Sequence, residues 1–426
     1  MIKFASVGML VAMVVVRTLA LLALMKFLAV RFGTEGFGQL SQILALGALF
    51  SVLAGGGLTN GIVRNLAASE ARDERAKWIK AALPIAAVSA LVLGLVALVL
   101  YRTAALALFP GQDLGFVLIV VAVSQAIVGF GNIALAFLSG THDITGFTIA
   151  NAVGSIAAAV FVGLLAYTLG FRGAAAGCAA MALMPAIAGL LIAGRAIHWP
   201  DVRHALFERE RAWALVKFGG SVYLAAAAVP LVWVYVRSDL ALREGWQAVG
   251  LWQSVTRISD AYMQVFGVIF MNYALPQIAA AVPTERTHRL RHIGVLIFAL
   301  FLSGAAVLYF ARDVVLRLAF SQAFTDATTF LVPQIVGDGF KLLSLLFVYY
   351  LLALNRATVQ AAMELLQAGL ILVAYLMLVQ HLGDRAAVVS YALATFVVSA
   401  ATLVLAARTP GLSAGRHERQ SQPSPV

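Results

Sequence analysis

The stretch GLWQSVTRISDAYMQ, residues 250–264, places a cation and an anion inside a segment that is otherwise apolar enough for a lipid bilayer. Its polar residues follow helical spacing i, i+4, i+7 and i+11, so they share one face of a helix. They are Gln253, Arg257, Asp260 and Gln264. A charge at the bilayer centre costs at least about 2.5–3.5 kcal/mol on insertion scales, so it requires a partner or a hydrated cavity. The stretch therefore predicts a membrane helix with one polar face.

The whole chain is too apolar for an ordinary water-soluble protein. Of its 426 residues, 62% are hydrophobic and 12% are charged, roughly half the charged fraction of a soluble domain, and its mean hydropathy is +0.94. The 30 Lys and Arg outnumber the 19 Asp and Glu, but they lie mostly in short segments between apolar runs, which argues against nucleic-acid binding. Cys178 is the single cysteine, so no disulfide can form within the chain.

Apolar runs long enough to cross a bilayer as helices, about 20 residues each, occur twelve times. They lie near residues 5–30, 37–63, 79–101, 114–139, 145–168, 173–194, 213–236, 247–273, 291–311, 329–352, 357–379 and 386–407. The first run continues past Arg17 to Val30, which favours a retained membrane helix over a cleaved signal peptide. The tail, residues 409–426, is predicted to be disordered and cytoplasmic.

The distribution of basic residues orients these helices. With a cytoplasmic amino terminus, the cytoplasmic segments hold 18 of the 30 Lys and Arg and the outer segments hold 8. The positive-inside rule therefore places both termini in the cytoplasm. The segments EGFGQLSQ and EGWQAVGLWQS, one in each half, both precede a basic loop. We therefore predict two six-helix lobes, residues 1–200 and 201–408, related by a parallel pseudo-two-fold repeat with a site at their interface.

Three further predicted helices carry polar residues at helical spacing. They are Gln334, Asp338 and Lys341 in one, Gln360, Glu364 and Gln367 in the next, and Gln125 and Asn132 in the amino-terminal half. Polar stripes of this kind do not suit lipid-facing helices and predict a hydrated cavity. The alternative is that charges three residues apart neutralise each other and only fasten the bundle. Those pairs are Arg257 with Asp260 and Asp338 with Lys341.

The first predicted helix carries two cations, although no acid lies within any predicted span of the amino-terminal half. Arg17 lies about 12 residues into its run, or ~18 Å, which is close to the midplane and too deep for easy snorkelling. Lys26 lies nearer the outer end, where it can snorkel. We expect Arg17 to face a ligand cavity; neutralisation by an acid of the other half, such as Glu364, is the rival explanation.

The sequence contains no catalytic or metal-binding constellation. Its seven histidines form no metal spacing, and its loops are too short for a nucleotide-binding or catalytic domain, so no cofactor is expected. The candidate site is instead a set of cavity residues that bind substrate: Arg17, Lys26, Asn60, Gln125, Asn132, Gln253, Arg257, Asp260, Gln264, Gln334, Asp338, Lys341 and Glu364.

Five segments carry a resemblance to a known family: FLAVRFGTEGFGQ, GGGLTNGIVRNLA, FGNIALAFLSGTHD, GLWQSVTRISDAYMQ and QIVGDGFKLLS. In this order and spacing they resemble the Wzx-type flippases of lipid-linked oligosaccharides, the group of the lipid III flippases of enterobacterial common antigen and the O-antigen translocases. The resemblance covers the chain from residue 1 to about residue 407.

The resemblance implies membership of the multidrug/oligosaccharidyl-lipid/polysaccharide exporter superfamily. It implies an all-α, V-shaped pair of lobes around a central polar cavity, in the inner membrane of a Gram-negative bacterium. The implied activity is not enzymatic: an undecaprenyl-pyrophosphate-linked oligosaccharide moves from the cytoplasmic to the periplasmic leaflet. A cationic, hydrated cavity would replace the hydration that the pyrophosphate loses, and rocking of the lobes would give alternating access. The implied partners are this substrate, membrane lipids and a polymerase of the same glycan pathway.

Two alternatives stay open at this point. A cation-coupled multidrug exporter of the same superfamily would be expected to have an acidic cavity, whereas the predicted spans hold four cations and three acids. A membrane-embedded polysaccharide polymerase or glycosyltransferase would be expected to have a long outer loop with catalytic charges, and the outer loops here are short.

Overall fold

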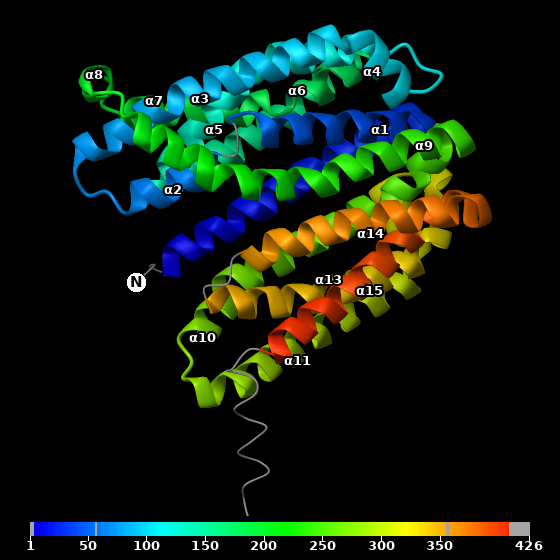
Figure 1. Cartoon of the computed structure of the whole chain (residues 1–426). Coiled ribbons are helices and arrows are strands. Elements are labelled where there is room, and N and C mark those ends of the chain that lie inside the picture. The colour runs from blue at the N-terminus through cyan, green and yellow to red at the C-terminus, as the bar shows by residue number, and fades with distance from the viewer. Residues whose placement is uncertain (1–3, 56–57, 355–357, 409–426) are drawn as a thin grey trace, which may run out of the picture. The chain divides into compact units, whose positions relative to one another are not determined.

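The computed structural model describes residues 4–55, 58–354 and 358–408, and these residues form helices and no strand (Figure 1). Eight helical segments of this described part are long and apolar enough to cross a membrane. The prediction of an all-α, multi-pass membrane protein is therefore confirmed. The predicted disordered tail, residues 409–426, lies outside the described residues.

Three kinks explain much of the difference between eight long helical segments and twelve predicted runs. The kinked helices are α1 (Phe4–Leu53), α6 (Ile144–Ala179) and α9 (Arg209–Ile269). Each continues through a glycine with positive φ: Gly33 at 65°, Gly170 at 63° and Gly245 at 83°. Glycine reaches this region without a steric penalty because it has no Cβ. Each long helix is therefore two predicted runs joined at a bend.

The other elements follow in chain order. Before α9 they are α2 (Leu58–Ala67), α3 (Arg72–Val99), α4 (Tyr101–Leu108), α5 (Gly115–Gly140), α7 (Leu183–Ala196) and α8 (Trp199–His204). After α9 they are η1 (Phe270–Ala274), α10 (Leu275–Ala279), α11 (Pro283–Phe310), α12 (Arg312–Ala319), η2 (Gln322–Ala327), α13 (Thr328–Ala353), α14 (Thr358–Leu382), η3 (Gly383–Arg385) and α15 (Ala386–Ala407). Each predicted run lies on one helix, on half of a kinked helix, or on such a half and the short helix that follows it.

The chain divides into two compact units within α9. Unit 1 comprises residues 1–250 and 319–321, and unit 2 comprises residues 251–318 and 322–426. The sequence placed the boundary between residues 200 and 201 instead. The first half of α9 packs in unit 1, where Gln42 of α1 donates hydrogen bonds to the Val234 carbonyl oxygen at 3.0 Å and to Ser238 Oγ at 2.9 Å. The predicted repeat of six helices plus six concerns the order in which the helices cross the membrane, which these packing units do not test. It stays a prediction.

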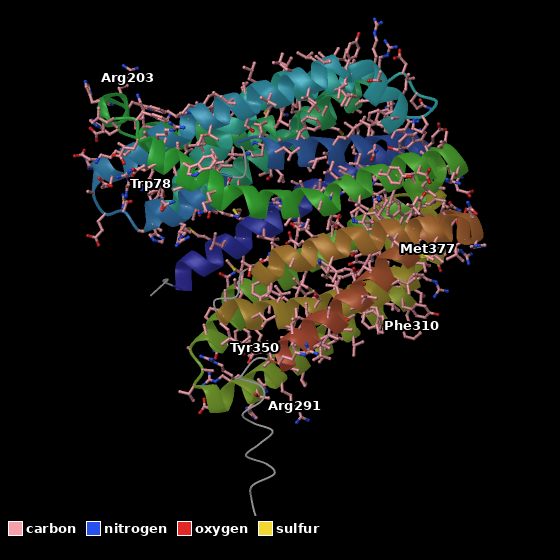
Figure 2. All side chains as sticks on the ribbon, viewed as in Figure 1. Trp78, Arg203, Arg291, Phe310, Tyr350 and Met377 are labelled. Carbon is pink, nitrogen blue, oxygen red and sulfur yellow. The ribbon has the colours of Figure 1, made fainter. Side chains whose placement is uncertain are left out.

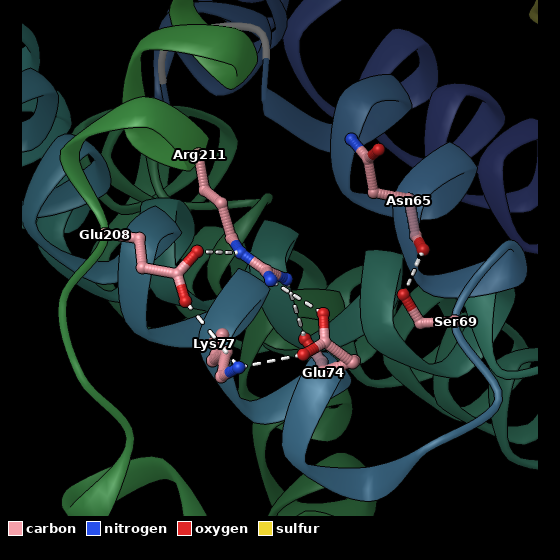
Figure 3. A network of polar contacts seen from close by, with 6 residues as sticks. All are labelled: Asn65, Ser69, Glu74, Lys77, Glu208 and Arg211. Carbon is pink, nitrogen blue, oxygen red and sulfur yellow. Dashed lines mark hydrogen bonds and ion pairs between the residues drawn. The ribbon is translucent and has the colours of Figure 1, made fainter.

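A network of ion pairs fastens α3 to the start of α9 at one end of unit 1 (Figure 3). Glu74 accepts from Arg211 Nη2 at 2.6 Å and from Lys77 Nζ at 2.8 Å. Arg211 Nε donates to Glu208, whose carboxylate also lies 3.7 Å from Lys77 Nζ. The Arg211 guanidinium lies over the Trp78 ring, 4.9 Å from its centroid. Two acids thus neutralise two cations at this end of the unit.

Candidate functional site

Asp338, in the middle of α13, lies at the centre of a buried polar cluster in unit 2 and is 0% exposed. Its Oδ2 accepts hydrogen bonds from Ser259 Oγ at 2.7 Å and from the Tyr262 hydroxyl. Its Oδ1 accepts from the Tyr391 hydroxyl at 2.8 Å and from Gln334 Nε2 at 3.2 Å. Within the described residues the carboxylate forms no ion pair, so four neutral donors satisfy it. These five residues are called the Asp338 cluster below.

The Asp338 cluster joins three helices of unit 2. Ser259 and Tyr262 belong to the second half of α9, and Tyr391 belongs to α15. Beside the carboxylate, α13 and α15 approach closely, because a Cβ on Gly337 would lie 2.6 Å from the Tyr391 ring. The cluster therefore fixes the packing of α9, α13 and α15 from within, and its carboxylate is not open to a cavity in this conformation.

Lys341, one turn beyond Asp338 on α13, has a different partner. Its Nζ donates to Gln367 Oε1 of α14 at 2.7 Å. Glu364, one turn earlier on α14, accepts from Gln360 at 3.2 Å. The alternative that Asp338 and Lys341 form an ion pair is therefore wrong, because the carboxylate is directed toward α9 and α15 and the ammonium group reaches α14.

The other ion pair that this alternative names is present. Arg257 Nη1 lies 3.2 Å from Asp260 Oδ2, and these side chains are 18% and 50% exposed. Gln264 donates to the backbone oxygen of Asp260 at 3.3 Å. Arg257 Nε and both amide atoms of Gln253 are buried and have no hydrogen-bond partner within the described part of the chain. The pair thus neutralises Arg257 without using all of its donors, which leaves hydrogen-bonding capacity on this face of α9.

In unit 1, Arg17 and Lys26 of α1 and Asn60 of α2 are exposed. Lys26 has a polar or electrostatic interaction with another residue. Arg17 forms no hydrogen bond or ion pair among the residues that the structure describes. The adjacent residue Val16, but not Arg17 itself, lines an apolar groove of about 560 Å³ between α1 and α6 together with Ile156. Arg17 is therefore an available cation on a helix whose other side chains line an apolar groove.

Two further candidates of unit 1 are used by the fold itself. Asn132 Nδ2 donates to the carbonyl oxygens of Ser51 and Ala54 at 2.9 and 3.1 Å, where the end of α1 leaves carbonyl groups unpaired. Gln125 is buried, and its Nε2 donates to the Val121 carbonyl oxygen of its own helix at 2.8 Å. These contacts show local structural roles, and a contact of either residue with substrate stays a prediction.

Sequence reasoning missed the hydroxyl groups around Asp338. Ser259 and Tyr262 flank Asp260 in the stretch 250–264, but the polar stripe was read from charged and amide side chains alone. Tyr391 lies in the almost wholly apolar run 386–407, and nothing in its spacing connects it to α13. The sequence signal for Ser259 and Tyr262 is their position beside Asp260 in an otherwise apolar run, although the carboxylate that they bind is Asp338 of another helix.

Solved structures of a transporter and of a flippase share this fold. An inward-facing multidrug resistance MATE family transporter of the MOP superfamily has a TM-score of 0.79 at 15% identity, with 96% of each chain covered. The lipid II flippase MurJ in its inward closed conformation has a TM-score of 0.67 at 12% identity, with 92% of this chain and 86% of that chain covered. The fold is therefore the two-lobe fold of MOP superfamily transporters.

The family described as polysaccharide biosynthesis protein matches residues 4–282, and the chain belongs to this family. The lipid III flippase of Escherichia coli (strain K12) is 29% identical over 388 residues, which cover 88% of this chain and 90% of that protein. The lipid III flippase of Shigella flexneri gives the same values. The resemblance carried by the five segments is thereby confirmed.

Proposed function

We propose that this protein is a flippase that moves a polyprenyl-pyrophosphate-linked oligosaccharide across the membrane, and that it acts as a transporter rather than an enzyme. The observation that carries the proposal is the similarity to lipid III flippases, which covers 88% of the chain and therefore includes both units. The likeness to MATE transporters is a likeness of fold at 15% identity, so it does not favour drug export over this function.

The chemistry of unit 1 supports the proposal. A pyrophosphate is anionic, and its transfer through hydrocarbon requires a cation that replaces lost hydration. Arg17 is exposed on a membrane helix and has no partner within the described residues, so its guanidinium is available to the phosphate oxygens. The apolar groove between α1 and α6 suits the polyprenyl chain.

Complementation tests the proposed function and its main rival together. The gene should restore surface glycan in one of a set of bacterial strains that each lack a single defined lipid-linked oligosaccharide flippase. The same strain should stop accumulating the lipid-linked oligosaccharide. The proposal fails if the full-length protein reaches the membrane, restores no strain and instead raises resistance to cationic drugs, since that result identifies a drug exporter.

The proposed location is the bacterial inner membrane with both termini in the cytoplasm. The first half of α9 connects Arg209, assigned to the cytoplasm by charge, with Arg243, assigned to the outside. In a Cys178→Ser background, Arg209→Cys should react with a membrane-impermeant thiol reagent only from the cytoplasm, and Arg243→Cys only from outside. Reaction of both positions from the same side would overturn this orientation.

A further inference from the structure

A second cavity, of about 430 Å³, lies at the end of unit 1 where α3 begins and where α5 and α7 end. Its rim carries three arginines: Arg72 and Arg75 from the first turn of α3, and Arg195 from the last turn of α7. Its apolar lining includes Ile79, Phe137 and Val202, which are buried. This cavity, called the basic pocket below, therefore combines cations at its mouth with an apolar floor.

The three arginines of the basic pocket have no acidic side chain as a partner among the described residues. Arg72 and Arg195 form no ion pair or hydrogen bond with other described residues, and both are exposed. Arg75 Nε donates to the carbonyl oxygen of Ser69 at 2.8 Å, a neutral partner that leaves its charge in place. Asp201 is the acid among the described lining residues, and it is 2.8 Å from His198 Nδ1. The pocket thus keeps an excess of positive charge.

The neighbouring ion-pair network contrasts with the basic pocket. Lys77 and Arg211 lie at the same end of unit 1, and Glu74 and Glu208 neutralise both of them (Figure 3). The cations of the network therefore differ from those of the basic pocket. Those of the network are paired, whereas those of the basic pocket face a shared cavity.

Tryptophans place the basic pocket at the level of lipid head groups. Three of the six tryptophans of the chain lie at this end: Trp78 near the start of α3, Trp199 in α8 and Trp213 near the start of α9. Figure 2 shows Trp78 and Arg203 at the same end of the unit. Tryptophan is enriched at the membrane–water interface, where its ring contacts both apolar and polar surroundings. A ligand in this pocket would therefore have a polar part in water and an apolar part in lipid.

We propose that the basic pocket binds the phosphate head group of an anionic phospholipid. The arginines contact the phosphate oxygens, which match the planar fork of a guanidinium group, and the apolar floor contacts the glycerol and the first carbons of the acyl chains. Basic pockets between membrane helices bind anionic head groups at membrane surfaces. This site is separate from Arg17, and it does not depend on the proposed flippase function.

Native mass spectrometry of the purified full chain, titrated with phosphatidylglycerol or phosphatidylcholine, tests the site. Phosphatidylglycerol should bind the wild-type protein more tightly than phosphatidylcholine. The double variant Arg72→Gln/Arg195→Gln should weaken the first phosphatidylglycerol site by roughly fivefold for each arginine, the effect of one basic side chain near an anionic head group. The variant Arg72→Lys/Arg195→Lys keeps the charge and loses the forked geometry. Its affinity for phosphatidylglycerol should therefore lie between those of the wild type and the glutamine variant.

The matched control is Arg203→Gln/Arg209→Gln, which removes the same charge from the same end of unit 1 but outside the pocket lining. It should leave the first phosphatidylglycerol site unchanged. An equal loss in the control would show diffuse attraction instead of a site. Unchanged binding in both glutamine variants, or displacement of phosphatidylglycerol by an equal concentration of inorganic phosphate, would also overturn the proposal.

Discussion

Asp338→Ala should destabilise the protein by roughly 3 kcal/mol or more, since each buried donor left without a partner costs about 1–3 kcal/mol. The substitution removes the acceptor of four hydrogen bonds, and the donors around the resulting void come from α9, α13 and α15. The loss should appear as a lower midpoint of unfolding in detergent and as a smaller amount of protein in the membrane.

Asp260→Asn is the matched control for Asp338→Asn, because the same chemical change is made on a carboxylate of the same unit that is 50% exposed. Exposed ion pairs contribute about 0–1 kcal/mol, so Asp260→Asn should change stability little. The stability of Asp338→Asn should lie between those of the wild type and Asp338→Ala. The amide retains one oxygen acceptor, but its NH2 group points toward side chains that are themselves donors. Equal stability of the two asparagine variants would contradict a structural role of the Asp338 cluster.

The contrast between these two carboxylates shows what spacing along one helix can predict. Arg257 and Asp260 lie three residues apart on a regular part of α9, so helical geometry alone brings them together, and the alternative of an ion pair holds here. Asp338 and Lys341 have the same spacing but do not pair. Hydroxyls from two other helices already surround the carboxylate, and Gln367 of a third helix takes the ammonium group.

For the fold as well, the sequence predicts features within one helix better than contacts between helices. Hydropathy predicted the helical runs because each run must satisfy its backbone within the membrane. The division of the chain within α9 could not be read from the repeat of two halves. It depends on contacts such as that of Gln42 with Ser238, two residues from different predicted halves that carry no charge and follow no spacing rule. The kink at Gly245 is visible in the sequence only as one glycine among 36.

Arg17→Gln should slow transport by roughly thirtyfold or more, because removal of one partner of a desolvated charge pair costs about 2 kcal/mol or more. Stability should not fall, since Arg17 is exposed and forms no hydrogen bond or ion pair within the described residues. Arg17→Lys should retain part of the activity, because an ammonium group still attracts pyrophosphate but cannot bind it with two parallel hydrogen bonds. The readout is the lipid-linked oligosaccharide in the cytoplasmic leaflet together with the surface glycan.

Lys26→Gln is the control on the same helix, where it also removes an exposed cation. Its effect should be milder, because Lys26 is predicted to lie nearer the outer end of the span and reaches water by snorkelling. A specific phosphate contact of Arg17 predicts this difference between the two variants. A general requirement for positive charge on α1 would instead make the two glutamine variants equally defective. A fully active Arg17→Gln protein at normal membrane levels would remove Arg17 from the transport path. The cost of a cation that is predicted to lie near the midplane would then need another explanation, because no contact within the described residues offsets it.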